Sequence, residues 1–148
     1  MPVNPIPEGY HAVTPYLLVA GAAPLIDFLK QAFDAVETER VARPDGGVMH
    51  AEVRIGGSPV MMGEPPGGAA KPAALYLYVA DVDATYARAL AAGAAAVSPP
   101  ADQFYGDRTG AVTDPAGNTW WIATHVEDVP KAELARRAAE AMKKWGQG

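Results

Sequence analysis

The segment Arg108–Asp128, RTGAVTDPAGNTWWIATHVED, contains the pattern that decides the fold. Its centre, Asp114–Asn118, combines Pro, Gly and Asn, which favour tight turns, and the flanking Val, Thr and Trp residues suit β-strands. Because side chains alternate along a strand, Trp120 and Trp121 point to opposite faces. We therefore predict a hairpin whose second strand has two non-polar faces, so that it is either buried on both or lines a cavity with one.

Composition narrows the class of protein. A chain of 148 residues with 49% hydrophobic and 20% charged residues is typical of a globular protein, and this length favours a single domain over 1–148. The net charge of −5, without a basic patch, argues against nucleic acid as a partner. The absence of cysteine excludes disulfides and thiolate chemistry. No apolar run approaches the roughly 18 residues of a membrane span, so we expect no membrane partner and a cytoplasmic location.

The first half of the chain reads as an arm followed by a β-α-β-β-β pattern. Three prolines in Met1–Tyr10 favour an extended arm, and apolar residues at helical spacing predict a helix that begins at Pro24. The Pro- and Gly-rich segment Glu64–Ala73 has the composition of a linker. The predicted strands are Val13–Val19, Glu37–Arg43, Val48–Ile55 and Val60–Gly63.

The second half repeats the first at a shift of 60 residues, since Leu77–Ala80 matches Leu17–Ala20. A second helix follows, with Asp81 as its N-cap and Gly93 as its end. A strand at 95–99 and a loop at 100–107 complete the repeat. We therefore predict two β-α-β-β-β modules, at about 12–64 and 74–125, joined by a linker at 65–73 and followed by a C-terminal helix at about 130–145.

Five segments in this order resemble the glyoxalase/bleomycin resistance/dioxygenase (vicinal oxygen chelate) superfamily, and within it the PhnB-like branch. The resemblance covers residues 10–128 and implies an α+β fold in which two tandem modules form a curved mixed sheet around a cleft. It also implies a homodimer, because such folds resolve their exposed sheet edges by two-fold pairing. The segments are Val13–Val19, Gly46–Glu64, Leu75–Ala94, Tyr105–Gly110 and the hairpin from Asp114 to Asp128.

The resemblance also implies where a metal would bind. Metal-using members of the superfamily place ligands at four positions, which fall by register on Thr14, Met61, Ala74 and Trp121. These side chains lack the nitrogen and carboxylate donors that divalent metals require. We therefore predict no metal and no cofactor, and we expect Trp121 to face the cleft while Trp120 lies in the helix-covered core.

The strand alternation and the resemblance together predict a largely aromatic cleft that suits a small apolar or aromatic molecule. A few polar groups are expected to line it, and two aromatic residues on the 100–107 loop are expected to close over it. The candidate ligand-binding residues are Tyr16, Leu18, His50, Glu52, Met61, Tyr76, Tyr78, Phe104, Tyr105, Arg108 and Trp121. Of the other histidines, His11 is expected to be exposed and His125 to cap the turn at Asp128.

Three functional hypotheses follow. The first is metal-independent binding of a small molecule in the cleft, as bleomycin-resistance-type proteins do by sequestration. The second is a metal-dependent lyase, isomerase or dioxygenase with ligands drawn from His50, Glu52 and Glu64, a hypothesis that leaves open whether the protein is an enzyme. The third is a structural or regulatory dimer whose cleft holds no ligand. No catalytic residue can be named, because the sequence contains no nucleophile–base motif and no phosphate-binding loop.

Overall fold

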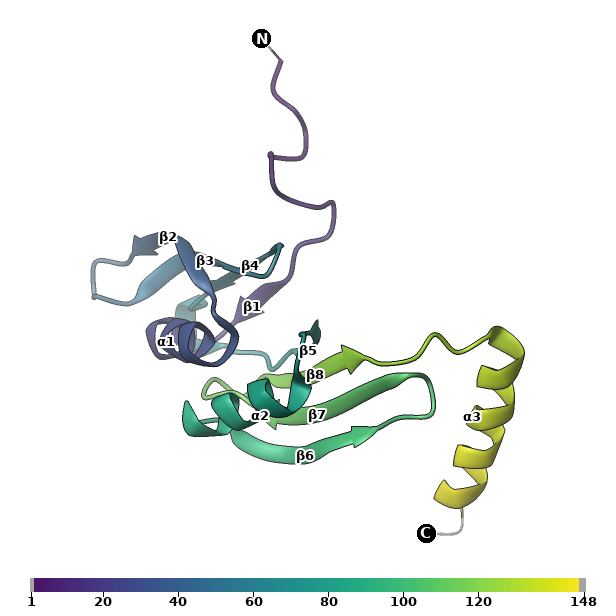
Figure 1. The fold of residues 1–148 in the computed structure, drawn as a ribbon. Coiled ribbons are helices and arrows are strands. Elements are labelled where there is room, and N and C mark those ends of the chain that lie inside the picture. Colours follow the sequence, from purple (N-terminus) through teal and green to yellow (C-terminus); the bar gives the residue numbers. More distant parts are fainter. Residues whose placement is uncertain (1, 147–148) are drawn as a thin grey trace.

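The computed structural model describes residues 2–146 and consists of two four-stranded sheets and three α-helices (Figure 1). Both sheets are mixed, with strand orders β1-β4-β3-β2 and β5-β8-β7-β6. The first module comprises β1 (Tyr16–Leu18), α1 (Ala22–Phe33), β2 (Val36–Ala42), β3 (Val48–Ile55) and β4 (Ser58–Gly63). The second comprises β5 (Ala74–Tyr78), α2 (Val82–Ala91), β6 (Ala95–Asp102), β7 (Asp107–Thr113) and β8 (Thr119–His125). The chain ends with helix α3 (Lys131–Trp145).

The strand register confirms the internal repeat and the predicted fold class. In the first sheet Tyr16 pairs with Met61, and in the second sheet Tyr76 pairs with Trp121, at the predicted shift of 60 residues. Each first strand is parallel to the last strand of its own module, whereas the remaining strands are antiparallel. The α+β architecture of two tandem modules is therefore as the sequence predicts.

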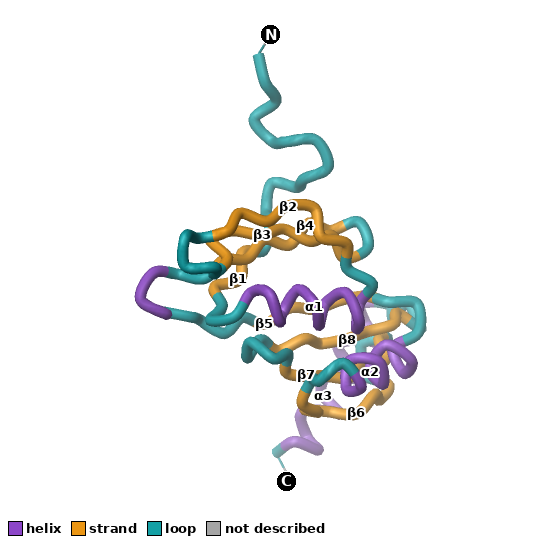
Figure 2. Tube along the Cα trace, turned by 90° about the vertical axis from the view of Figure 1, so that its left-hand side faces the viewer, coloured by secondary structure: helices purple, strands orange, loops and turns teal. Residues whose placement is uncertain are grey.

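The helices of the two modules lie against each other and share one core. Figure 2 shows α1 between the first sheet and the strands of the second. The aromatic ring of Phe33 on α1 lies 5.0 Å from that of Trp120 on β8, measured between ring centroids. An ion pair of 2.7 Å between Arg88 on α2 and Asp34 links the helices at their exposed side. Because both helix-covered faces turn inward, the opposite faces of the two sheets point away from each other.

The hairpin between β7 and β8 is stabilised by hydrogen bonds to Asp114. The buried Asp114 carboxylate accepts hydrogen bonds from the amides of Ala116 and Asn118, at 2.8 and 3.0 Å, and from the indole nitrogen of Trp120 at 2.8 Å. The Asn118 side chain accepts a further bond of 2.9 Å from the amide of Ala73, just before β5. The turn therefore fixes the end of the linker as well as the hairpin.

Several predicted boundaries differ from those of the structure. Helix α1 begins at Ala22, two residues before Pro24, because a proline is tolerated anywhere in the first turn. Strand β6 continues to Asp102 despite Pro99 and Pro100, which lie on an edge strand where the ladder is irregular. The loop after it is therefore shorter than predicted. The expected N-cap of α2 is confirmed, since the Asp81 carboxylate accepts a bond of 3.1 Å from the amide of Ala84.

The two ends of the described chain extend away from the sheets (Figure 1). Residues 2–10 contain no helix or strand, as predicted, but the strand expected at Val13–Val19 is shorter and forms only β1, Tyr16–Leu18. Helix α3 is attached through Arg137, which pairs with Glu127 at 2.8 Å and donates to the carbonyl of Phe104. Within residues 2–146, no helix has the length and apolar character needed to cross a membrane.

Candidate functional site

The two tryptophans of β8 lie on different faces, as predicted. Trp120 is 2% exposed and packs in the shared core, whereas Trp121 is 40% exposed on the opposite face of the second sheet. The corresponding face of the first sheet carries Tyr16 and Met61. We call these two surfaces the open faces of the sheets, because neither helix α1 nor helix α2 covers them.

The open face of the first sheet carries a hydrogen-bonded chain of four side chains. The hydroxyl of Tyr16 lies 3.2 Å from Nδ1 of His50, and Nε2 of His50 lies 3.0 Å from Oε1 of Glu52. Tyr10 of the arm donates its hydroxyl to the other oxygen of Glu52. Burial alone would raise the pKa of Glu52, but the hydrogen bonds from Tyr10 and His50 outweigh it and lower the pKa. Glu52 is therefore a buried carboxylate with both oxygens occupied.

The arm is held on this face by a second contact. Arg54 on β3 donates a bond of 3.1 Å to the carbonyl of Gly9, and its guanidinium carbon lies 5.5 Å from the centre of the Tyr10 ring. Gly9 adopts a φ of +84°, a conformation that glycine tolerates without strain. The arm therefore crosses the open face of the first sheet at Gly9 and Tyr10.

The open face of the second sheet carries a denser network around Asp107. The hydroxyls of Tyr76 and Tyr78 both donate to Oδ2 of Asp107, at 2.7 and 2.9 Å, and Nδ1 of His125 lies 2.8 Å from Oδ1. The other ring nitrogen of His125 lies 2.7 Å from Asp128, which agrees with the predicted contact at that turn. We call Tyr76, Tyr78, Asp107 and His125 the Asp107 network.

The ionisation of this network is set by its buried carboxylate. Asp107 is 4% exposed, and burial would raise its pKa, but hydrogen bonds from His125, Tyr76 and Tyr78 outweigh burial and lower it. The pKa of His125 is raised by its bond to Asp107 and then by that to Asp128. The pKa of Tyr78 is raised by its bond to Asp107, and that of Tyr76 by burial and then by the same carboxylate. An ionised aspartate with protonated tyrosines is therefore the stable state at neutral pH.

Arg108 does not join the other candidate residues. It lies on the helix-covered side of β7, where it pairs with Asp83 of α2 at 2.8 Å and with Asp102 of β6 at 3.3 Å. The physical reason is strand alternation, since Arg108 shares its side with Gly110, where an added Cβ would lie 2.9 Å from the ring of Tyr86 on α2. Its neighbour Asp107 is the polar residue on the open face.

The two aromatic residues of the 100–107 segment, Phe104 and Tyr105, lie in different surroundings. Tyr105 lies beside the Asp107 network and contributes to the raised pKa of Tyr76. Phe104 lies instead at a groove of about 330 Å³ that borders α3. The rings of Phe104 and Tyr105 meet edge to face at 5.2 Å. Only Tyr105 is therefore placed to contact a molecule on the open face of the second sheet.

The candidate residues form two groups within one chain. Tyr16, Leu18, His50, Glu52 and Met61 belong to the first sheet, and Tyr76, Tyr78, Tyr105 and Trp121 to the second sheet and its loop. Because the open faces point away from each other, one chain does not gather both groups into a single cleft. A groove of about 980 Å³ borders the second group along β5, between the β3–β4 turn and α2.

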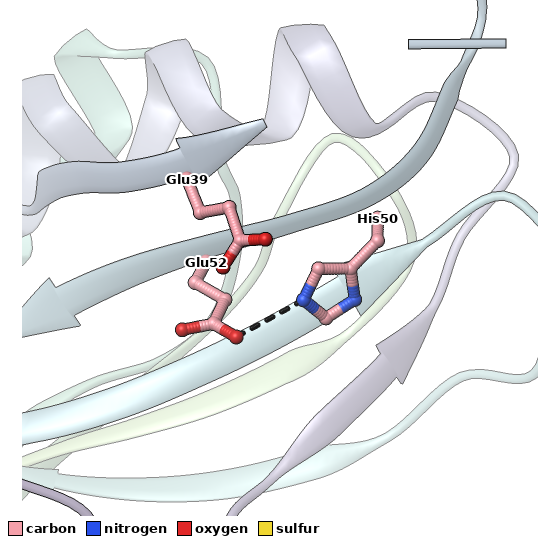
Figure 3. A group of neighbouring side chains, drawn as sticks. All are labelled: Glu39, His50 and Glu52. Carbon is pink, nitrogen blue, oxygen red and sulfur yellow. Dashed lines mark hydrogen bonds and ion pairs between the residues drawn. The ribbon is translucent and has the colours of Figure 1, made fainter. Parts of the chain in front are cut away.

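The superfamily's metal positions do not fit a metal. Of the four predicted positions, Met61 pairs with Tyr16 and Trp121 with Tyr76, whereas Thr14 precedes β1 and Ala74 pairs with Thr119. None of these side chains offers a carboxylate or an imidazole. Among the described residues, one other group could hold a cation: Glu39, His50 and Glu52, whose ligand atoms lie within 4.8 Å of one another (Figure 3). Glu64 is not part of this group, because its carboxylate accepts a bond of 2.8 Å from the amide of Val48.

Sequence reasoning missed four residues of these networks: Tyr10, Glu39, Asp107 and His125. Asp107 could have been found from strand alternation, since it shares the face of Ala111, which lies opposite Trp121. His125 could have been found in the same way, two alternations beyond Trp121. Tyr10 and Glu39 carry no comparable signal, because the path of the arm and the bulge after Glu37 cannot be read from local pattern.

The repeated β-α-β-β-β modules, the parallel pairing of first and last strands and the two open faces define the class: a double-module protein of the glyoxalase type. The chain matches the Glyoxalase/Bleomycin resistance protein/Dioxygenase superfamily over residues 10–122 and belongs to that superfamily. The resemblance seen in the sequence is therefore confirmed.

Relatives in this superfamily include proteins of mycobacteria. An uncharacterized protein of Mycobacterium bovis is 42% identical over 135 residues, which cover 83% of this chain and 89% of that protein. The structure is also similar to that of TioX from Micromonospora sp. ML1, with a TM-score of 0.66 and 28% identity over 78% of this chain and 99% of that chain. A PhnB protein from Bacillus cereus shares the fold at 19% identity, with a TM-score of 0.63 over 77% of this chain and 99% of that chain.

Proposed function

We propose that the protein binds a small, largely apolar or aromatic molecule, without metal, in a cleft that a second copy of the chain completes. The observation that carries this proposal is the set of aromatic side chains left exposed on the open faces, where Tyr78 is 60% and Trp121 is 40% exposed. Flat aromatic surfaces of this kind favour stacking with a planar ligand. A contiguous apolar surface on a globular protein marks an interaction site.

The need for a second copy of the chain follows from the opposite directions of the two open faces. A ligand cleft buries most of the ligand surface and therefore needs two walls. One chain offers the two walls on opposite sides, so a two-fold pair of chains would place the first sheet of one copy against the second sheet of the other and build two equivalent clefts. Each chain would then contribute Tyr16 and Met61 to one cleft and Tyr76 and Trp121 to the other.

Calorimetric titration of metal-free protein with 1-naphthalenemethanol tests the binding function. We expect saturable binding of one molecule per chain, and at least about fivefold weaker binding by Trp121→Ala, since an aromatic pair contributes about 1 kcal/mol. Trp145→Ala is the matched control, because Trp145 is an exposed tryptophan of α3 that borders the groove at Phe104 and belongs to neither sheet. Equal affinity of the two variants would place binding elsewhere and contradict the proposal.

The oligomeric state provides an independent test. Sedimentation at micromolar concentration is expected to give twice the chain mass of 15.5 kDa. A monomer at that concentration would remove the second wall, and the two-copy cleft would have to be abandoned. A dimer that binds no aromatic probe would favour the third hypothesis, a structural or regulatory dimer without ligand.

A metal-dependent enzyme of the same superfamily is the second candidate, and Glu39, His50 and Glu52 favour it. Glu39 and Glu52 face each other across β2 and β3, an arrangement that is unfavourable without a cation between the carboxylates. Against a metal, both oxygens of Glu52 already accept hydrogen bonds, from Tyr10 and His50. We therefore expect that protein purified without a histidine tag contains no stoichiometric metal. One divalent ion per chain, lost in both Glu39→Gln and His50→Ala, would establish the enzyme candidate instead.

A further inference from the structure

The positions of the hydroxyl protons in the Asp107 network determine which ligand groups can form hydrogen bonds with it. Each tyrosine hydroxyl has one proton and two lone pairs. Tyr76 and Tyr78 both direct their protons to Oδ2 of Asp107. What the two hydroxyls present to the open face is therefore oxygen lone pairs alone. A ligand that contacts them directly must supply hydrogen-bond donors.

The rings of the same residues favour the same kind of group. The rings of Tyr76 and Tyr78 lie 5.3 Å apart between centroids, and Tyr76 is the strand neighbour of Trp121. The faces of aromatic rings carry partial negative charge and attract cations within about 6 Å. An ammonium group above these residues would therefore gain both from the ring faces and from the hydroxyl oxygens.

The charges around the network agree with this preference. Asp107 and Asp128 carry two negative charges, and His125, when protonated between them, carries one positive charge. Three arginines lie near the network or along the groove beside β5, and each is engaged elsewhere. Arg108 pairs with Asp83 and Asp102 on the helix-covered side. Arg54 and Arg88 border the groove, where Arg54 donates to Gly9 and lies against Tyr10, and Arg88 pairs with Asp34 at 2.7 Å. The net charge around the network is therefore negative, which favours a positively charged ligand.

We propose that the cleft selects ligands in which a flat aromatic ring system carries an ammonium group, with the ammonium group on the hydroxyl oxygens of Tyr76 and Tyr78 and the ring system on Trp121. The inference rests on the proposed binding function and specifies its ligand class. Asp107 acts as a positioning residue, because it is buried and fixes the direction of both hydroxyls without touching the ligand. An anionic ligand of the same shape would meet the hydroxyl lone pairs close to two negative charges and would bind more weakly.

Three ligands with the same ring system test the charge preference: 1-naphthylmethylammonium, 1-naphthalenemethanol and 1-naphthoate. Calorimetry at pH 7.5 in one buffer is expected to show that the ammonium compound binds at least about tenfold more tightly than the alcohol, as a charge-assisted hydrogen bond with a cation–π contact would give. The carboxylate is expected to bind more weakly than the alcohol. Tyr78→Phe removes one acceptor oxygen and should reduce the ratio of ammonium to alcohol affinity severalfold.

Asp102→Asn is the matched control, because it removes a carboxylate on the helix-covered side and should leave that ratio unchanged. The wild-type series alone decides the question if Tyr78→Phe does not fold. Equal affinity for the ammonium compound and the alcohol, or tightest binding of the carboxylate, would overturn this inference and leave the proposed function intact. Failure of all three ligands to bind at millimolar concentration would overturn the proposed function itself.

Discussion

Replacing each tryptophan of β8 separately by alanine tests the assignment of the two faces. The Trp120 side chain is 2% exposed, contacts Phe33 and donates from its indole nitrogen to the buried Asp114. Removing a buried tryptophan leaves a cavity that costs about 3–5 kcal/mol of stability. This figure includes the loss of the hydrogen bond from the indole nitrogen to Asp114. A domain of this size has a stability of about 5–15 kcal/mol, so Trp120→Ala should be close to unfolding.

Trp121→Ala should cost much less, about 1–2 kcal/mol, because 40% of the Trp121 surface is already exposed to solvent. Urea unfolding followed by far-ultraviolet circular dichroism measures both variants without relying on the removed fluorophores. A difference of about 2 kcal/mol corresponds to a shift of about 1 M in the urea midpoint for a small domain.

A protein dilution series separates the fold from the assembly, since a residue at a subunit interface affects stability in a concentration-dependent way. Trp120→Phe serves as a control that keeps one aromatic ring but loses the donor and part of the indole, and it should cost less than Trp120→Ala. If Trp121→Ala were as destabilising as Trp120→Ala at every concentration, the faces would be exchanged. The open-face residues would then be core residues, and the open face of the second sheet could not bind a ligand.

Three further changes test the hairpin ends and the histidine. Asp114→Ala should cost at least about 3 kcal/mol by urea unfolding, because it strands the buried donors of Asn118 and Trp120. Gly106→Ala should cost about 2 kcal/mol or more, since φ is +97° and the new Cβ would lie 2.2 Å from the carbonyl oxygen of Glu127, whereas Gly117→Ala, with φ of +95° and open space, should cost less. The raised pKa of His125 means that its stabilising contribution is complete below the ordinary histidine value of about 6.5 and is lost as pH rises through the higher folded value. Wild type should therefore lose its advantage over His125→Gln across that window, and an advantage that grows with pH would contradict the assignment.

The fold could be predicted because its signals are local and repeated. The turn at Asp114–Asn118, the N-cap at Asp81 and the shift of 60 residues each depend on a few neighbouring residues. Trp120 and Trp121 were placed correctly because alternation along a strand needs no tertiary knowledge. Boundaries failed where tertiary context overrides local pattern, as at Pro99 and Pro100, which stay in an edge strand.

The site could be predicted only in part, because it depends on register and on contacts distant in sequence. Strand alternation predicts that His50 and Glu52 share one face, which the structure confirms. The predicted residue Arg108 faces the helices instead, and its neighbour Asp107 lies on the open face. The contact of Tyr10 with Glu52 joins residues 42 positions apart, through an arm without secondary structure. The relative direction of the two sheets cannot be read from local pattern, because it follows from the packing of α1 against α2. This packing leaves the open faces of one chain on opposite sides.

The opposite directions of the two open faces also link ligand binding to the pairing of two chains. If Trp121 of one chain and Tyr16 of the other form opposite walls of one cleft, the ligand contacts both copies and must bind the pair more tightly than the single chain. By thermodynamic linkage, a saturating ligand must then stabilise the pair by the same factor. The prediction is that 1-naphthylmethylammonium lowers the concentration at which the pair dissociates in sedimentation experiments. At a fixed ligand concentration, Trp121→Ala should reduce this effect without preventing pairing. A ligand that binds with equal affinity above and below the dissociation concentration would show that each open face acts alone, with the groove along β5 as the complete site.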